Sequence, residues 1–354
     1  MQRIGKRERT QRQLTRLSDK DGRLEKIRQW LEVDLGLRLE SLEATAGDAS
    51  FRCYFRAVVG DVSYIVMDAS LDLENVAQFV KVARLFEQAG IHVPAVHEED
   101  VGRGFLLLGD LGSRCYLDHL NESSASLLYG DALNALLRLQ SGIEIEGCPL
   151  PFYRREKLRS EMDLFHDWFL RRLLGLEPTP SFKALFDTLQ GLLIRSAMAQ
   201  PMVCVHRDYH SRNLMLVEKD NPGVLDFQDA VIGPVTYDLV SLLRDCYIAW
   251  PDDRVESWVA EYHALLQERR LIGNVGLEQL MQWFDWMGLQ RHLKAVGIFS
   301  RLHLRDDRPA YLGDIPRTLN YIDNICERYS GLGEFRGFLQ ETVFKRMDRM
   351  ELFE

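Results

Sequence analysis

The chain has 354 residues, of which 46% are hydrophobic and 27% charged, a composition typical of a globular protein with a large core. Its net charge of −9 argues against a general nucleic-acid-binding protein. Its six cysteines are scattered and form no Cys-x-x-Cys pair, which argues against zinc and disulfide frameworks and favours a reducing cytoplasm. No apolar run approaches the roughly 20 residues that a membrane span needs.

The first 22 residues form a basic segment. Seven lysines and arginines face only Glu8 and Asp19 among the first twenty residues. No apolar run follows, so the segment lacks the pattern of a secretory signal. We interpret it as a solvated, flexible leader, the alternative being a contact with an acidic partner or a membrane surface.

The next part of the chain predicts a small β-rich domain, because short apolar runs alternate there with turn residues. Two of these runs flank Gly60-Asp61, a pattern typical of a β-hairpin. We expect, in chain order, a helix over residues 24–37, strands over 51–59 and 63–68, a helix over 73–88, and strands over 93–96 and 105–108.

Beyond residue 117 the hydrophobic pattern is mostly helical, as in residues 127–139 and 154–170. A strand-rich island over residues 203–227 interrupts it, and helices are expected again up to the C-terminus. The chain thus predicts a small β-rich part, a glycine-containing connector over 109–112 and a larger α-rich part.

The island carries the strongest chemical signal in the sequence. An apolar strand leads into His206-Arg-Asp208, Asn213 follows five residues after the aspartate, and another apolar strand comes next. After a turn, Asp226 stands at the end of a third strand. Phosphoryl transfer needs a carboxylate that orients and deprotonates a hydroxyl, and oxygen ligands for Mg²⁺. Asp208 suits the first task, and Asn213 with Asp226 suits the second.

The residues of this island resemble the aminoglycoside-phosphotransferase superfamily, and more narrowly its bacterial kinases of N-acetylmuramate and N-acetylglucosamine. The resemblance is carried by the loop from His206 to Asn213, by Leu225-Asp-Phe-Gln-Asp229, and by further stretches at 47–52, 66–68, 106–112, 233–238 and 286–294. It runs from about Leu24 to the C-terminal region. It implies a bilobal, protein-kinase-like α+β fold: a leader (1–22), an N-lobe (23–108), a hinge (109–112) and a C-lobe (113–354).

The resemblance also implies roles for individual residues. Asp208 would be the catalytic base, and Asn213 and Asp226 would bind Mg²⁺. The loop over the ATP phosphates would comprise Gly47, Asp48, Ala49, Ser50, Phe51 and Arg52, and the adenine-binding hinge would comprise Gly109, Asp110 and Leu111. Asp238 would brace the catalytic loop, although an aspartate there could equally cap a helix.

One feature departs from the kinase pattern. Kinases place a lysine on the third strand to hold the ATP phosphates, and here that strand ends Met67-Asp68. A substitute cation is therefore expected among Arg52, Arg56, Lys81, Arg84 and Arg212. We favour Arg52 and Arg212, the latter as a catalytic residue, the alternative being ordinary surface charges.

The acceptor is expected to bind to the α-rich part. Residues 283–308 carry an excess of basic side chains, from which we predict substrate contacts by Arg291, His292 and Lys294. A basic pocket suits an anionic acceptor such as N-acetylmuramate, although the same pattern fits a solvated helix face. The predicted activity is ATP-dependent phosphorylation of an amino sugar at its anomeric hydroxyl in cell-wall recycling. The alternatives are another small alcohol (an aminoglycoside, choline or homoserine) or a nucleotide-binding pseudokinase. No nucleic-acid, membrane-spanning or obligate protein partner is expected.

Overall fold

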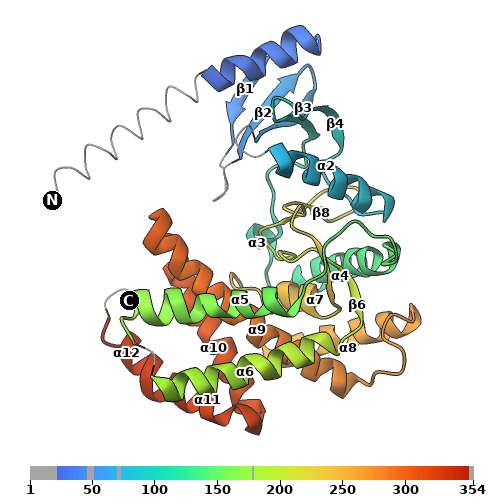
Figure 1. Cartoon of the computed structure of the whole chain (residues 1–354). Helices are drawn as coiled ribbons and strands as arrows, with labels where there is room; N and C mark the ends of the chain where they lie inside the picture. Colours follow the sequence, from blue (N-terminus) through green and yellow to red (C-terminus); the bar gives the residue numbers. More distant parts are fainter. Residues whose placement is uncertain (1–21, 46–51, 70–72, 178, 351–354) are drawn as a thin grey trace, which may run out of the picture. The chain divides into compact units, whose positions relative to one another are not determined.

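The computed structural model describes residues 22–45, 52–69, 73–177 and 179–350, and the chain divides into two compact units. The smaller unit contains the residues up to Ala83 together with Pro94–Leu111. The larger unit contains Arg84–Val93 and the residues from Gly112 onward. Figure 1 shows the larger sheet in the first unit and most of the helices in the second, which confirms the predicted α+β class.

The sheet of the smaller unit has five antiparallel strands in the order β1-β2-β3-β5-β4. β2 and β3 form the predicted hairpin, and Gly60 in its turn has φ +57°, which glycine adopts without strain. The strand bounds are Ser41–Ala44 (β1), Cys53–Val59 (β2), Val62–Asp68 (β3), Val96–Asp100 (β4) and Phe105–Gly109 (β5).

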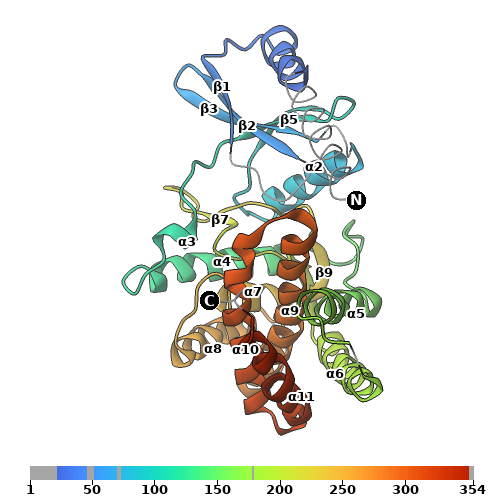
Figure 2. The ribbon, with the colours of Figure 1, turned by 90° about the vertical axis from the view of Figure 1, so that its left-hand side faces the viewer.

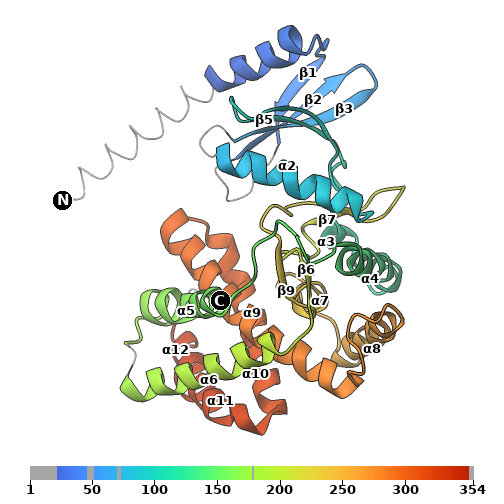
Figure 3. The ribbon, with the colours of Figure 1, turned by 45° about the vertical axis from the view of Figure 1, so that its right-hand side comes forward.

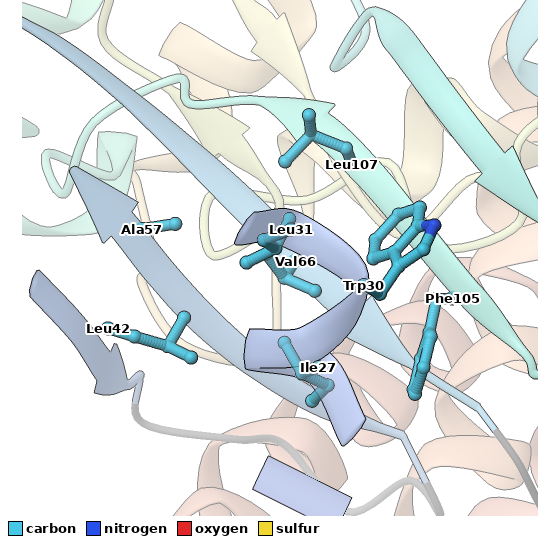
Figure 4. Packing of buried hydrophobic residues seen from close by; sticks show 8 residues of the cluster. All are labelled: Ile27, Trp30, Leu31, Leu42, Ala57, Val66, Phe105 and Leu107. Atoms are coloured by element: carbon cyan, nitrogen blue, oxygen red, sulfur yellow. The ribbon is translucent and has the colours of Figure 1, made fainter. Parts of the chain in front are cut away.

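A leading helix covers one face of this sheet. It runs over residues 22–34, and its last turns, Trp30–Asp34 (η1), are wound as a π-helix. Trp30 lies against Phe105, with 5.5 Å between the ring centroids. Figure 4 shows the cluster that the helix forms with the strands: Ile27, Trp30, Leu31, Leu42, Ala57, Val66, Phe105 and Leu107. Burial of these apolar side chains holds the helix to the sheet.

Helix α2 (Leu73–Gln88) has the bounds that its apolar stripe predicts, but the strand expected next is misplaced. That strand was expected at residues 93–96, whereas β4 begins at Val96. Val93 and Pro94 are buried by packing, and Pro94 has no N–H to donate to a strand. β4 itself is an edge strand with exposed polar side chains, so it lacks an apolar signature.

In the larger unit α9, of 30 residues, is the central helix and packs against α5, η2, α7 and α10. Figure 2 shows α5, α7 and α10 around it. A Cβ at Gly297 would collide with the backbone of Leu164, so glycine permits this close approach. The helices are α3 (Tyr116–His119), α4 (Ala125–Gly142), α5 (Arg155–Leu164), η2 (Phe165–Leu173), α6 (Pro180–Met198), α7 (Tyr237–Leu243), α8 (Asp252–Glu268), α9 (Leu277–Asp306), η3 (Pro309–Asp314), α10 (Ile315–Arg328), η4 (Ser330–Leu332), α11 (Gly333–Phe338), η5 (Leu339–Phe344) and α12 (Lys345–Met347).

Two short strand pairs form the predicted island. β6 (Met202–Val205) pairs antiparallel with β9 (Val231–Pro234), and β7 (Leu214–Met215) pairs with β8 (Gly223–Val224). Figure 3 shows β6 and β9 side by side among the helices. These strands are buried and fix both ends of the loop between β6 and β7. Among the described residues, no helix is both long and apolar enough to cross a membrane.

Candidate active site

The loop between β6 and β7 presents Asp208, and His206 organises it from inside. The imidazole Nε2 of His206 lies 2.9 Å from the carbonyl oxygen of Leu225, and the backbone N–H of Asp208 donates to its Nδ1 at 3.2 Å. These two bonds require a neutral ring with its proton on Nε2. Burial lowers the pKa of His206 to about 4, which keeps the ring neutral at neutral pH. His206 therefore braces the loop.

Two aspartates hold the loop from helix α7 and the residues that follow it. Asp238 accepts hydrogen bonds from the backbone N–H groups of His206 (2.6 Å) and Arg207 (2.9 Å), which confirms its predicted bracing role. Asp245 accepts from both the backbone N–H (2.9 Å) and the hydroxyl of Ser211. Both carboxylates are buried. The backbone on either side of Asp208 is thus fixed by hydrogen bonds to buried carboxyl groups.

Arg207 connects the loop to a buried carboxylate that the sequence did not single out. Its guanidinium donates to Glu161 at 2.6 Å, and Glu161 also accepts from the hydroxyl of Tyr153 and lies 3.6 Å from the ammonium nitrogen of Lys294. Burial raises the pKa of Glu161, but Lys294 and Arg207 lower it below its ordinary value. Glu161 therefore stays ionised and joins α5 and α9 to the loop.

Asp208 is half-buried, and the cationic groups of Lys294, Arg291 and Arg207 act on its carboxylate electrostatically. Burial raises its pKa, but the nearby side chains, Lys294 first among them, lower it to below its ordinary value. The others are His210, Arg291 and Arg207. Asp208 is therefore ionised at neutral pH, the state in which it can accept a proton.

Asn213 stands just before β7 and Asp226 two residues after β8, its partner strand. The backbone N–H of Leu225 donates to the carbonyl oxygen of Asn213 at 2.9 Å. The Asn213 amide nitrogen donates to the backbone oxygen of Asp208, which leaves its amide oxygen for a ligand. Asp226 is exposed and has φ +61°. An amide oxygen and a carboxylate are hard oxygen donors, so this pair fits Mg²⁺.

This pair is small for a metal site. The described residues contain no group of three or more His, Cys, Asp and Glu side chains placed to hold a metal ion. A protein site with one or two carboxylates is typical of Mg²⁺ that is also bound by phosphate oxygens of a substrate. The donor set therefore fits magnesium delivered with a nucleotide.

In the smaller unit, the predicted phosphate loop lies largely outside the described residues, since Gly47, Asp48, Ala49, Ser50 and Phe51 are not among them.

Arg52 is described and half-buried, just before β2. At the predicted hinge, the backbone N–H of Gly109 donates to Ala95 at 2.8 Å. The Asp110 carboxylate forms a two-pronged pair with Arg56, at 2.6 and 3.1 Å. Arg56 is thereby committed to Asp110, which weakens it as a candidate to hold the ATP phosphates.

Arg212 and the three predicted acceptor residues all lie in the larger unit. The guanidinium of Arg212 is exposed and lies 3.6 Å from the ring centroid of Tyr247. Arg291, His292 and Lys294 are buried on α9 rather than forming a solvated face.

Two of these three side chains also make polar contacts inside the unit. His292 Nε2 lies 2.9 Å from the carbonyl oxygen of Arg244, and Lys294 donates to the hydroxyl of Tyr237 at 3.0 Å. Lys294 and Arg291 act on Asp208 electrostatically, whereas the His292 ring is enclosed in the core.

A family model described as "Phosphotransferase enzyme family" matches residues 41–272, which include the loop of Asp208 and both proposed magnesium ligands. The chain belongs to this family. It is therefore a small-molecule kinase, as its residues predicted.

Relatives of this phosphotransferase match it over most of its length. The N-acetylmuramate/N-acetylglucosamine kinase of Pseudomonas putida is 46% identical, over 88% of this chain and 90% of the relative. The protein of the same name from Neisseria meningitidis is 41% identical, over 90% of this chain and 95% of the relative.

Solved structures with low sequence identity share the fold of this phosphotransferase. Choline kinase LicA from Streptococcus pneumoniae has a TM-score of 0.59 at 14% identity, covering 85% of this chain and 99% of that one. The ADP-bound aminoglycoside phosphotransferase APH(2'')-Ib has a TM-score of 0.57 at 15% identity, covering 82% and 95%. These likenesses bear on the fold alone and confirm the predicted protein-kinase-like architecture.

Proposed function

We propose that this chain transfers the γ-phosphoryl group of ATP to the anomeric hydroxyl of N-acetylmuramate, N-acetylglucosamine or both. The observation that carries the proposal is the ionised Asp208, in a loop that Asp238 and Asp245 hold by hydrogen bonds and whose backbone accepts from Asn213. The names of the relatives at 41–46% identity support the choice of acceptor.

In the proposed reaction Asp208 orients the acceptor hydroxyl and takes its proton. The anomeric hydroxyl of a sugar is more acidic than an ordinary alcohol, so a carboxylate with a low pKa can act as the base late in the transfer. Asn213 and Asp226 would hold Mg²⁺, which when bound supplies positive charge to the phosphate oxygens. The bracing by His206 and Asp238 keeps Asp208 in one position, which is the main contribution a kinase makes to this chemistry.

The cation that holds the ATP phosphates is also a proposal. Arg52 and Arg212 stay the favoured residues, and the pairing of Arg56 with Asp110 supports leaving Arg56 out. Arg52, with residues 47–51, would cover the phosphates, and residues 109–111 would contact adenine. A cytoplasmic location and a place in cell-wall recycling stay predictions.

Purified protein incubated with Mg-ATP and a panel of acceptors tests the proposal. We expect ATP consumption with the two N-acetylated amino sugars, and a sugar 1-phosphate in the phosphorus NMR spectrum of the product. Consumption with an aminoglycoside, choline or homoserine but not with either sugar would show that the proposed acceptor is wrong.

Replacement of the proposed base gives the sharper test of mechanism. Asp208→Asn keeps the shape of the side chain but removes the proton acceptor, so we expect kcat to fall by at least about 100-fold. Nucleotide binding, measured by calorimetry, should stay within a few-fold of wild type. Turnover close to wild type in this variant would exclude Asp208 as the base.

A further inference from the structure

Arg291, on α9, carries a buried charge with few hydrogen bonds. Its side chain is 6% exposed. Among the described residues it makes one hydrogen bond, a weak one from Nη1 to the sulfur of Cys246 at 3.9 Å, and its Nε has no partner. The carboxylates of Asp208 and Asp245 act on it electrostatically without accepting a hydrogen bond from it. A buried guanidinium whose N–H groups lack acceptors lowers the stability of the folded protein unless a ligand accepts hydrogen bonds from them.

His210, in the catalytic loop itself, also has a buried polar atom without a hydrogen-bond partner among the described residues. It stands two residues after Asp208, and its Nδ1 is buried without a hydrogen-bond partner in the described part of the chain. Its ring meets Tyr247 edge to face, with 5.3 Å between centroids. Buried ring nitrogens are normally hydrogen-bonded, and the described residues supply no partner for this one. A bound ligand could supply it.

Three consecutive residues after α7 bring these groups together. Asp245 holds Ser211 in the catalytic loop, Cys246 contacts Arg291, and Tyr247 contacts the ring of His210. The segment is anchored from α10, because Arg317 donates to the carbonyl oxygen of Cys246 at 2.7 Å. Arg291 and His210 are thus fixed by one rigid segment beside Asp208, rather than by mobile surface side chains.

We propose that Arg291 and His210 form an anion subsite that binds the carboxylate of the acceptor. The inference rests on the proposed function, because N-acetylmuramate differs from N-acetylglucosamine by a lactyl ether that ends in a carboxylate. A guanidinium offers two N–H groups in a fork that matches two carboxylate oxygens, and an imidazole N–H adds a third donor. N-acetylglucosamine lacks the carboxylate and gains nothing from this subsite.

The transferred phosphoryl group is a second source of anionic oxygens near Asp208, and two acceptors distinguish it from the carboxylate. Contacts to the phosphoryl group would raise kcat/KM for both sugars, whereas contacts to the lactyl carboxylate would raise it for N-acetylmuramate alone. Arg291→Met keeps the length of the side chain and removes its charge. We expect kcat/KM for N-acetylmuramate to fall roughly 10- to 100-fold in this variant, and that for N-acetylglucosamine to change less than about threefold.

The wild-type protein provides a test that does not depend on how a variant folds. The methyl ester of the N-acetylmuramate lactyl group loses the charge and adds one methyl group, so it should be roughly 10- to 100-fold poorer than the acid. In Arg291→Met the acid and the ester should be equal. Arg244→Met is the matched control, because Arg244 is also buried but is paired with Asp285 at 2.6 Å. Any effect of that control should fall equally on both sugars.

The possible outcomes distinguish a carboxylate subsite from a phosphoryl contact and from a packing role. Selective loss with N-acetylmuramate, together with an acid–ester difference that disappears in Arg291→Met, supports the subsite. Equal loss with both sugars would overturn it in favour of a contact to the phosphoryl group, and no loss would leave Arg291 a packing residue. Turnover of N-acetylglucosamine by the wild type keeps the proposed function standing in either case. A wild type that phosphorylates neither sugar would overturn both proposals.

Discussion

Arg207 has a backbone conformation that is costly for any residue except glycine. Its φ is +80°, in the left-handed region, and non-glycine residues held there store about 1–3 kcal/mol of strain. Its side chain offsets this cost, because it is paired with the buried Glu161 at 2.6 Å and lies over the ring of Tyr153. The loop of Asp208 therefore contains a strained backbone that an ion pair holds in place.

Two substitutions at this residue separate strain from pairing. Arg207→Ala and Arg207→Gly both lose the pair with Glu161, but only glycine relaxes the backbone. We expect both variants to be less stable than wild type, and the glycine variant to be more stable than the alanine variant by about 1 kcal/mol. Urea unfolding measures the difference. An alanine variant as stable as the glycine variant would show that the backbone is not strained.

Sequence reasoning singled out Asp208, Asn213 and Asp226 as candidates because they are close in sequence and flanked by apolar runs. It missed Glu161 and Asp245, because their roles depend on partners that are distant in the chain. Glu161 is one of several acidic residues on an amphipathic helix, and no local pattern marks it as the one that is buried. A charge at a position that the helical periodicity assigns to the core is the signal that could have found it.

At the scale of elements, α9 and the junction of α5 with η2 pack closely because Gly297 has no side chain. A methyl group there would overlap Leu164, whose backbone cannot move without disturbing the helix. We expect Gly297→Ala to lower the free energy of unfolding by about 1–3 kcal/mol.

Gly130, within α4, is the matched control for that substitution. A Cβ at this position would meet nothing within 4 Å. Gly130→Ala should therefore stabilise the protein by about 0.5–1 kcal/mol through the helix propensity of alanine. Thermal unfolding of the two variants measures the difference. If Gly297→Ala left the stability unchanged, α9 and the junction of α5 with η2 could move apart at no cost in free energy.

The elements with long apolar patterns were the ones that sequence reasoning placed well, as α2 and the β2–β3 hairpin show. β4 was misplaced because an exposed edge strand need not alternate apolar and polar residues. The π-helical windings of η1 and η2 were not predicted either. They depend on how a helix adjusts to its neighbours, and local sequence does not encode that adjustment.

At the scale of the whole molecule, buried neutral histidines link stability to pH. Burial lowers the pKa of His292 to about 3, whereas the unfolded side chain titrates near 6.5. Below pH 6.5 the unfolded chain therefore binds a proton that the folded chain does not, so the stability contributed by His292 is lost as pH falls. The contribution of Asp238 to stability changes with pH in the opposite direction, because burial raises its pKa to about 7. The folded chain therefore binds a proton on Asp238 at a higher pH than the unfolded chain does.

His292→Gln isolates the histidine contribution, since Asp238 is common to both proteins. Between pH 7 and pH 5 wild type should lose about 2 kcal/mol more stability than His292→Gln. Glutamine can keep the hydrogen bond to Arg244, so the two proteins should be similar near pH 7. Parallel stability curves for the two proteins over this pH range would contradict the neutral, buried ring.

Trp30 offers an optical signal for one unit alone. The other five tryptophans belong to the larger unit, and Trp30 is 3% exposed against Phe105 in the smaller one. The difference in fluorescence between wild type and Trp30→Phe therefore reports the melting of the smaller unit, while the Trp30→Phe protein reports the larger. Titrating ATP or a sugar into both proteins would show how far each ligand raises the melting temperature of each unit.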